Sequence, residues 1–255
     1  MSLAAEIKIL SSMTSEERIL TRHIIDLAKQ ADNTGLFRSS NFLDERQQFI
    51  CSACLNKEGY SGFESNGGFP DAERRVILFH GYGEKLPFTP VVFNYRSEDR
   101  PSHRDFLGSL MALEIKREMI GDILVGKSRT VVFAMNAVLP LIEDIVKIGR
   151  TGVKISYDFC PGDIPVQEHE KIDATVKSLR LDSVLSAAVK LSREKTQELI
   201  RSNGAVLNHV TTFEPNEKVN EGDVFSVRGM GKFRLEEVGG MSKKERIFIT
   251  IQKYK

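Results

Sequence analysis

Two arginines and a glutamine recur at four-residue spacing in the C-terminal part of this sequence. Arg193, Gln197 and Arg201 share one face of a predicted helix, because residues four apart lie one above the other. Ser192 predicts an N-cap, so Ser192, Arg193 and Lys195 bring free backbone N–H groups and positive charge to one helix end. Such a face suits contact with phosphate groups. The same pattern also fits an ordinary solvated helix face with a normal cap.

The helix that must hold these side chains is predicted from its end signals and its apolar spacing. It runs from Ser192 to a stop at Asn203-Gly204, after a first amphipathic helix that begins at Leu181. Leu199 and Ile200 lie on the other side of the second helix and should face the first one. Two short helices are therefore expected to lead directly into strands.

The strands that follow these helices are predicted at 224–228, 233–237 and 246–252. A turn at Gly229-Met-Gly231 separates the first two. In the last strand, isoleucines at 247, 249 and 251 alternate with polar neighbours, so one face of the sheet should be buried.

The order of motifs in this region resembles that of the S4-type RNA-binding domain. The resemblance is carried by Arg180-Leu-Asp, Ser192-Arg193, Glu198-Leu-Ile, Gly204-x-Val-x-Asn208 and Gly222-Asp223. The sequence departs from the pattern at Thr196, where alanine is usual, and at His209, where glycine is common. The resemblance implies a module that binds structured RNA.

Charge is divided unevenly along the chain. From residue 171 onward, 16 Lys and Arg stand against 11 Asp and Glu, a net charge of +5. Residues 1–170 hold 20 against 24, a net charge of −4, so the total of +1 hides a basic C-terminal part. Clustered cations favour a polyanionic partner because binding releases counterions. Ordinary variation in surface charge is the alternative.

Three cysteines, Cys51, Cys54 and Cys160, do not make a disulfide framework in a chain of 255 residues and favour a reducing cytosol. The N-terminus lacks the basic segment and long apolar stretch of a secretion signal. Apolar runs such as 131–135 are too short to span a bilayer. We therefore expect a cytoplasmic protein with no membrane partner.

The N-terminal sequence predicts two helices and a loop. A capping box at Thr14-x-x-Glu17 opens the first helix, which ends near Asn33-Thr34-Gly35. The second helix is expected at 41–57, buried through Phe42, Leu43, Phe49 and Ile50, and residues 60–71 read as a loop.

The middle of the chain alternates strand and helix patterns. Strands are expected at 75–79, 91–95, 122–125, 130–134 and 153–158, and helices at 103–116 and 136–147. From 91 onward this order predicts a ferredoxin-like sheet with both helices on one face, as in RNA-recognition motifs. Phe93 and Tyr95 share a strand face, where core packing is favoured over base stacking, and 130–134 lacks the Gly-aromatic signature of that motif.

The fold class is therefore predicted to be α+β, with three parts. These are an N-terminal helical segment at 1–73, a ferredoxin-like, RNA-recognition-motif-like middle domain at 74–163 and an S4-type RNA-binding domain at 177–255. Residues 161–171 read as a short linker.

Motifs that would support catalysis or metal binding are incomplete. Cys51-Ser-Ala-Cys54 has the spacing of a metal pair without a second pair, and His80-Gly-Tyr-Gly83 is not followed by the Lys-Ser/Thr of a phosphate-binding loop. His103-Arg-Asp opens like a kinase catalytic loop, but no Asp-Phe-Gly accompanies it. No catalytic residue, metal, cofactor or small-molecule substrate is predicted, and we expect no enzyme.

The stretch His103–Val125, the order of the modules and the end Gly222–Arg234 closely resemble the bacterial YlmH family from about Asn41 to the C-terminus. That family is cytoplasmic, is encoded among cell-division genes and acts with the ribosome. The resemblance implies binding to rRNA and tRNA on large ribosomal subunits that still carry a peptidyl-tRNA. There it implies support for C-terminal tailing of stalled chains in ribosome-associated quality control.

The leading hypothesis is a non-enzymatic RNA-binding protein of the ribosome. An rRNA-modification enzyme or its accessory, and a cell-division interaction factor, stay open as alternatives. The predicted RNA-binding residues are Arg180, Ser192, Arg193, Lys195, Gln197 and Arg201, with Arg228, Lys232 and Arg234 as outlying contacts.

Overall fold

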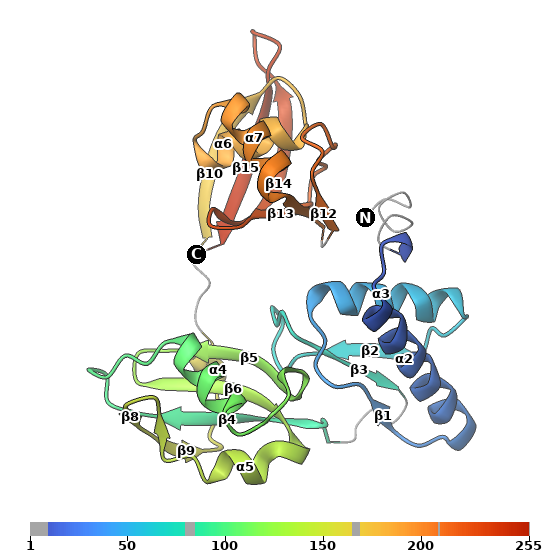
Figure 1. The fold of residues 1–255 in the computed structure, drawn as a ribbon, viewed down its shortest axis with the longest axis vertical. Helices are drawn as coiled ribbons and strands as arrows, with labels where there is room; N and C mark the ends of the chain where they lie inside the picture. Colours follow the sequence, from blue (N-terminus) through green and yellow to red (C-terminus); the bar gives the residue numbers. More distant parts are fainter. Residues whose placement is uncertain (1–9, 80–84, 165–168, 209, 255) are drawn as a thin grey trace. The chain divides into compact units, whose positions relative to one another are not determined.

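The computed structural model describes residues 10–79, 85–164, 169–208 and 210–254. By its internal contacts the chain divides into two compact units, one at Met13–Pro165 and one that holds the C-terminal part from Val166 onward. Both units combine helices with antiparallel strands, which confirms the predicted α+β class (Figure 1). Within the described residues, no helix is long and apolar enough to cross a bilayer.

Two helices and a small sheet form the first part of the larger unit. Helix α2 (Ser15–Thr34) begins with the predicted capping box at Thr14 and ends at Gly35, whose φ of 65° suits glycine. Helix α3 (Glu45–Lys57) is capped by Asp44. The sheet has the order β1-β3-β2, with bounds Arg38–Ser39, Val76–Phe79 and Phe63–Asn66.

Two predictions for this part are wrong in detail. The helix predicted from 41 begins only at Glu45, because Leu43 forms a β-bridge with Arg75 and holds this segment extended. The loop predicted at 60–71 contains β2, which pairs with β3 along its whole length. Phe63 and Phe79 pack with ring centroids 6.4 Å apart, a cross-strand contact that local sequence does not reveal.

The second part of the larger unit is the predicted ferredoxin-like sheet. Its strands are antiparallel and have the order β5-β6-β4-β9. The elements run in the chain as β4 (Phe88–Asn94), α4 (His103–Met111), β5 (Ile120–Val125), β6 (Arg129–Met135), α5 (Leu139–Glu143) and β9 (Lys154–Ser156). This order of strand, helix, strand, strand, helix, strand confirms the split arrangement.

Both helices of this sheet are shorter than predicted. Helix α4 ends at Met111, before Glu114, which has a left-handed φ of 60°, and Arg117–Met119 form a 3-10 turn. Helix α5 follows a 3-10 turn, and Lys147–Ile148 belong to β7, which pairs with β8 (Thr151–Gly152).

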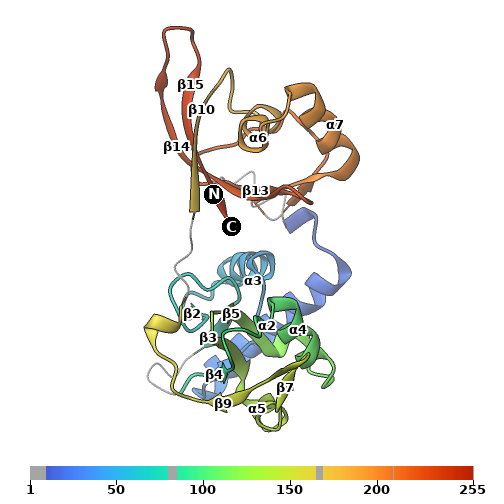
Figure 2. The same cartoon turned by 90° about the vertical axis from the view of Figure 1, so that its left-hand side faces the viewer.

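The C-terminal unit is a six-stranded antiparallel sheet with two helices on one face (Figure 2). The strand order is β10-β15-β14-β13-β11-β12. Helices α6 (Leu181–Val189) and α7 (Arg193–Asn203) have the predicted positions. The strands are β10 (His169–Val176), β11 (Ala205–Leu207), β12 (Val210–Thr212), β13 (Val224–Val227), β14 (Gly231–Met241) and β15 (Ile247–Tyr254).

Strand β10 was missed, because 161–171 read as a linker. It pairs with β15 over eight residues from His169 to Val176. Its polar residues alternate with Ile172, Ala174 and Val176, which pack under the helices. Residues 165–168 of the predicted linker lie outside the described part of the chain.

Two of the motifs that carry the S4-type resemblance are in contact. Asn208, with a φ of 47°, accepts a hydrogen bond from Val224 N–H at 3.0 Å and donates one to Asp223 at 2.8 Å. The segments Gly204–Asn208 and Gly222-Asp223 are therefore joined in the fold. His209, where the sequence departs from the S4-type pattern, lies outside the described residues.

Candidate nucleic-acid interface

The carboxylate of Asp182 is the centre of a polar cluster between α6 and α7. Although fully buried, it accepts hydrogen bonds from Arg180 Nε at 3.2 Å, Arg193 Nε at 2.9 Å and Gln197 Nε2 at 2.5 Å. Both guanidinium groups also reach it through a second nitrogen. We call Arg180, Asp182, Arg193 and Gln197 the Asp182 cluster.

Backbone hydrogen bonds fix the two helix ends that form this cluster. Asp182 N–H donates to the carbonyl of Pro215 at 2.9 Å, which anchors the start of α6. Ser192 caps α7 by accepting a hydrogen bond from Lys195 N–H at 3.3 Å. Thr196 is fully buried, and its hydroxyl donates to the carbonyl of Ser192 at 3.0 Å. The threonine is thus accommodated in place of the usual alanine without distorting the helix.

The electrostatics of the cluster leave it cationic. Burial raises the pKa of Asp182, but the hydrogen bonds from Arg193 and Gln197 and the charges of Arg193 and Arg180 outweigh burial and hold its pKa below the ordinary value. One carboxylate therefore faces two guanidinium groups, whose side chains are 40% and 45% exposed. Their remaining N–H donors are available to an anion in a fixed orientation.

The structure brings some of the predicted RNA-binding residues together. Arg180, Arg193 and Gln197 meet at Asp182, and exposed Arg201 lies one turn beyond Gln197 on the same face of α7. Ser192 serves as the helix cap, and Lys195 is exposed but lies two residues from Arg193, on a different side of the helix.

The other predicted contacts lie elsewhere in the C-terminal unit. Phe233 and Leu235 of β14 are buried with the helices, so the alternating Lys232 and Arg234 point to the face away from α7. Arg228 is exposed in the turn that precedes β14. These three residues are not part of the Asp182 cluster.

Asp182 itself was not predicted to belong to the site. The sequence does contain a signal for its burial, because this carboxylate lies among Leu181, Val184 and Leu185, which form the buried side of α6. A buried acidic residue next to Arg180 requires compensating partners. Only the fold shows that one of them is Arg193.

The middle domain does not offer the open sheet face that RNA-recognition motifs use for stacking bases. Phe93, a considered stacking residue, is fully buried against Phe106, with ring centroids 5.5 Å apart. Tyr95 packs beside this core and donates to the carbonyl of Gly126 at 2.8 Å. The interpretation of both residues as core elements is therefore the one the structure supports.

The second face of the same sheet is covered as well. Phe133 is fully buried, and its ring centroid lies 5.4 Å from that of Phe69 and 6.3 Å from that of Phe88. Gly68 has a φ of 92°, and its backbone approaches Phe133 so closely that a Cβ would lie 2.4 Å from that ring. Phe42 belongs to the same buried cluster and also packs on this face of the sheet. Base stacking of the RNA-recognition-motif kind has no open surface there.

Other polar residues of the larger unit have structural roles. Arg117 donates to the carbonyls of Ile120 and Gly121, the latter at 3.2 Å, and burial with the neighbouring charge of Arg74 lowers its pKa to about 10. Burial raises the pKa of the Cys51 thiol to about 12. The segment His80–Gly83, which the sequence does not predict to be a phosphate-binding loop, lies outside the described residues.

The α+β fold and the fixed arginine cluster beside a helix face have the charge and donor geometry that RNA-binding proteins use. Comparison with known sequences finds an RNA-binding description for the middle domain, not for the unit that holds the Asp182 cluster. Residues 99–159 match the family described as "Putative RNA-binding domain in YlmH". The chain is also 30% identical over 248 residues to "Ribosome-associated protein quality control protein P2" of Bacillus subtilis (strain 168), covering 94% of this chain and 96% of that protein. The chain therefore belongs to the YlmH family.

A solved structure resembles part of the fold. "Cell division protein ylmH from Streptococcus pneumoniae" matches with a TM-score of 0.51 and 20% sequence identity. The match covers 60% of this chain and 97% of that one. At this identity the likeness concerns the fold alone.

Proposed function

We propose that this protein is a non-enzymatic RNA-binding factor of the ribosome and that the α7 face, with the Asp182 cluster and Arg201, contacts the RNA. The observation that carries the proposal is the pair of guanidinium groups held by one buried carboxylate. The name of the Bacillus subtilis relative supports a place in ribosome-associated quality control. The finer proposal is cytoplasmic binding to rRNA and tRNA on large subunits that carry peptidyl-tRNA, in support of C-terminal tailing.

The cluster suits recognition of a folded backbone better than reading of a base sequence. Asp182 fixes the planes of Arg180 and Arg193, so their free donors have defined directions toward phosphate oxygens. Phosphate contacts position a protein on RNA through shape, without sequence information. Arg201 adds a charge on the same helix face.

The test is sedimentation of the full chain from lysate on a sucrose gradient, followed by sequencing of crosslinked RNA. The variant Arg193→Lys/Arg201→Gln keeps a cation beside Asp182 and removes one charge. The matched control Lys243→Arg/Lys244→Gln removes one charge from the exposed β14–β15 turn of the same unit.

We expect crosslinks to large-subunit rRNA and tRNA that the first variant loses and the control keeps. Each lost phosphate contact should also lower the slope of log affinity against log salt by roughly 0.7 to 0.9. Wild-type protein that stays at the top of the gradient without RNA contradicts the function. Equal crosslinking by both variants contradicts the assigned face.

A further inference from the structure

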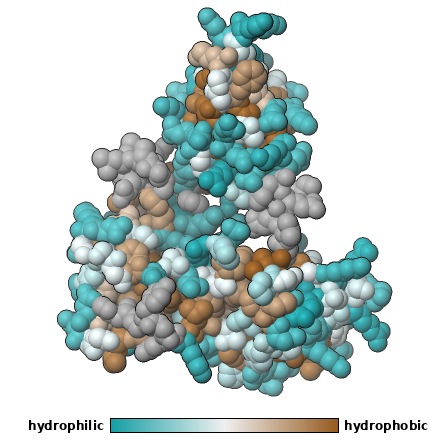
Figure 3. Space-filling view, turned by 180° about the vertical axis from the view of Figure 1, so that it is seen from behind, coloured by the Kyte–Doolittle hydropathy of each residue, from teal (hydrophilic) through white to brown (hydrophobic). Residues whose placement is uncertain are grey.

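The C-terminal sheet has a second face that the helices leave open. Side chains of β15 alternate across the sheet, and Ile249 and Ile251 enter the core under α6 and α7. The intervening positions point to the other face and form a row of Phe248, Thr250, Gln252 and Tyr254. The view from behind shows hydrophobic residues among hydrophilic ones on this unit (Figure 3).

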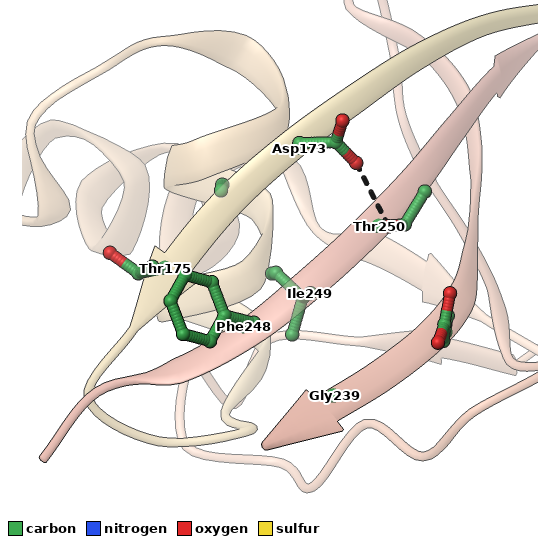
Figure 4. Close-up of a pocket in the computed structure, with 8 residues that line it drawn as sticks. Asp173, Thr175, Gly239, Phe248, Ile249 and Thr250 are labelled. Atoms are coloured by element: carbon green, nitrogen blue, oxygen red, sulfur yellow. Dashed lines mark hydrogen bonds between the residues drawn. The ribbon is translucent and has the colours of Figure 1, made fainter. Parts of the chain in front are cut away.

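One end of this row lies in a groove of about 550 Å³ that crosses β10, β15 and β14 (Figure 4). Phe248 is 50% exposed there, beside Thr175 of β10. Gly239 faces it from β14, and a Cβ at that glycine would lie 3.3 Å from Phe248 Cβ. The missing side chain leaves the aromatic ring accessible to a flat ligand.

The charged groups that line the groove are carboxylates. Asp173 accepts a hydrogen bond from the Thr250 hydroxyl at 2.9 Å, and its carboxylate lies on the groove side of β10 (Figure 4). Glu237 is exposed on β14. Carboxylates pair with the exocyclic amino groups of nucleobases and repel phosphates. A nucleotide would therefore enter the groove by its base and keep its phosphate outside.

Cations lie along the rest of the open face. Lys232 Nζ stands 5.3 Å from the centroid of the Tyr254 ring at the far end of the row. Arg234 is exposed and paired in register with Gln252. Arg246 donates to the Thr175 hydroxyl at 3.0 Å beside the groove. The phosphate groups of a nucleotide bound in this way would lie outside the groove, near these positive charges.

We propose that this open face binds an unpaired stretch of RNA, with one base stacked on Phe248 in the groove and the strand running toward Tyr254. The two rings are six residues apart on β15, about 20 Å, which several nucleotides span. Aromatic rings on an open sheet face are the usual platform for unpaired bases. This inference rests on the proposed RNA-binding function but uses a surface separate from the α7 face.

The test measures fluorescence anisotropy of the full chain with labelled decacytidine, decauridine and a stem-loop RNA. We expect decacytidine to bind more tightly than decauridine, since only cytosine offers an amino group to Asp173 or Glu237. Phe248→Leu should weaken decacytidine binding roughly 5- to 150-fold, the range for one stacked base. Met241→Leu, which alters another exposed apolar residue of the same hairpin, is the matched control.

The outcomes separate this inference from the function on which it rests. Stem-loop binding should depend on Arg193 and Arg201 and be unchanged in Phe248→Leu. Decacytidine binding that is insensitive to Phe248→Leu, or absent while the stem-loop still binds, overturns the open-face inference alone. If an arginine-rich peptide shifts the amide resonances of Gly239 and Thr250 while decacytidine does not, the groove takes a basic protein segment and the inference is also overturned.

Discussion

Replacing Asp182 by asparagine tests the central role of that carboxylate. The substitution keeps the size of the side chain but removes both ion pairs, at 2.9 and 3.2 Å, and replaces one of the two acceptor oxygens by an NH2 donor that faces guanidinium groups. Because the arginine side chains are 40% and 45% exposed, each pair contributes only about 0.5–1 kcal/mol after solvent screening. Loss of charged hydrogen bonds to a buried group adds about 1–2 kcal/mol.

These contributions sum to a loss of about 2–4 kcal/mol in the unfolding free energy of the C-terminal unit. For a unit of this size, the melting transition should fall by roughly 10–30 °C, which scanning calorimetry of the full chain measures. Arg22→Gln on the exposed side of α2 serves as a control that alters a surface charge without touching the cluster.

RNA binding by Asp182→Asn should change by different amounts for different RNAs. The variant carries one more positive net charge, so we expect a higher affinity for an unstructured polyanion such as decauridine and a steeper salt slope. Affinity for the stem-loop should rise less or fall, because the guanidinium planes are no longer fixed. An unchanged melting transition together with an unchanged ratio of the two affinities would refute the idea that Asp182 orders the arginines.

Further predictions concern other described residues. Because the pKa of Asp182 is lowered in the fold, its stabilisation is present above the unfolded value of about 3.9 and is lost as pH falls through the folded value. The difference in urea midpoint between wild type and Asp182→Asn should therefore shrink between pH 6 and pH 3. Cys51, with a pKa of about 12, should resist iodoacetamide at pH 8 while exposed Cys160 reacts, as peptide mass spectrometry would show; equal labelling would contradict the burial. Gly121→Ala places a Cβ 2.7 Å from the Phe42 ring, so it should lower the free energy of unfolding by about 1–3 kcal/mol in chemical denaturation. A denaturation midpoint equal to that of the wild type would contradict this, since the core would then rearrange to accept the methyl group.

Local signals in the sequence were sufficient for several elements. The ends of α2 and α7 were predicted because caps such as Thr14 and Ser192 act on the backbone within three residues. The alternation in β15 was predicted because burial repeats every second residue. The order of elements in the middle domain also followed from these local patterns.

Long-range pairing explains what the sequence did not reveal. Strand β10 is polar at every second position and is held by β15, some 80 residues further along the chain. Asp182 finds Arg193 eleven residues away, across the turn between two helices. The S4-type assignment of this unit and the three-part domain division stay predictions, since they depend on resemblance and on boundaries rather than on a contact.

The covered second face of the ferredoxin-like sheet has a consequence for cooperativity. Val92, Val131 and Phe133 share one buried cluster with Phe42 and Val76, so the N-terminal segment and the sheet stabilise each other through the same core. A fragment that begins at residue 74 would expose this apolar face to water and to other copies of itself. Residues 13–165 should therefore melt in one transition, and a chain shortened at its start should aggregate rather than survive as a smaller RNA-binding module.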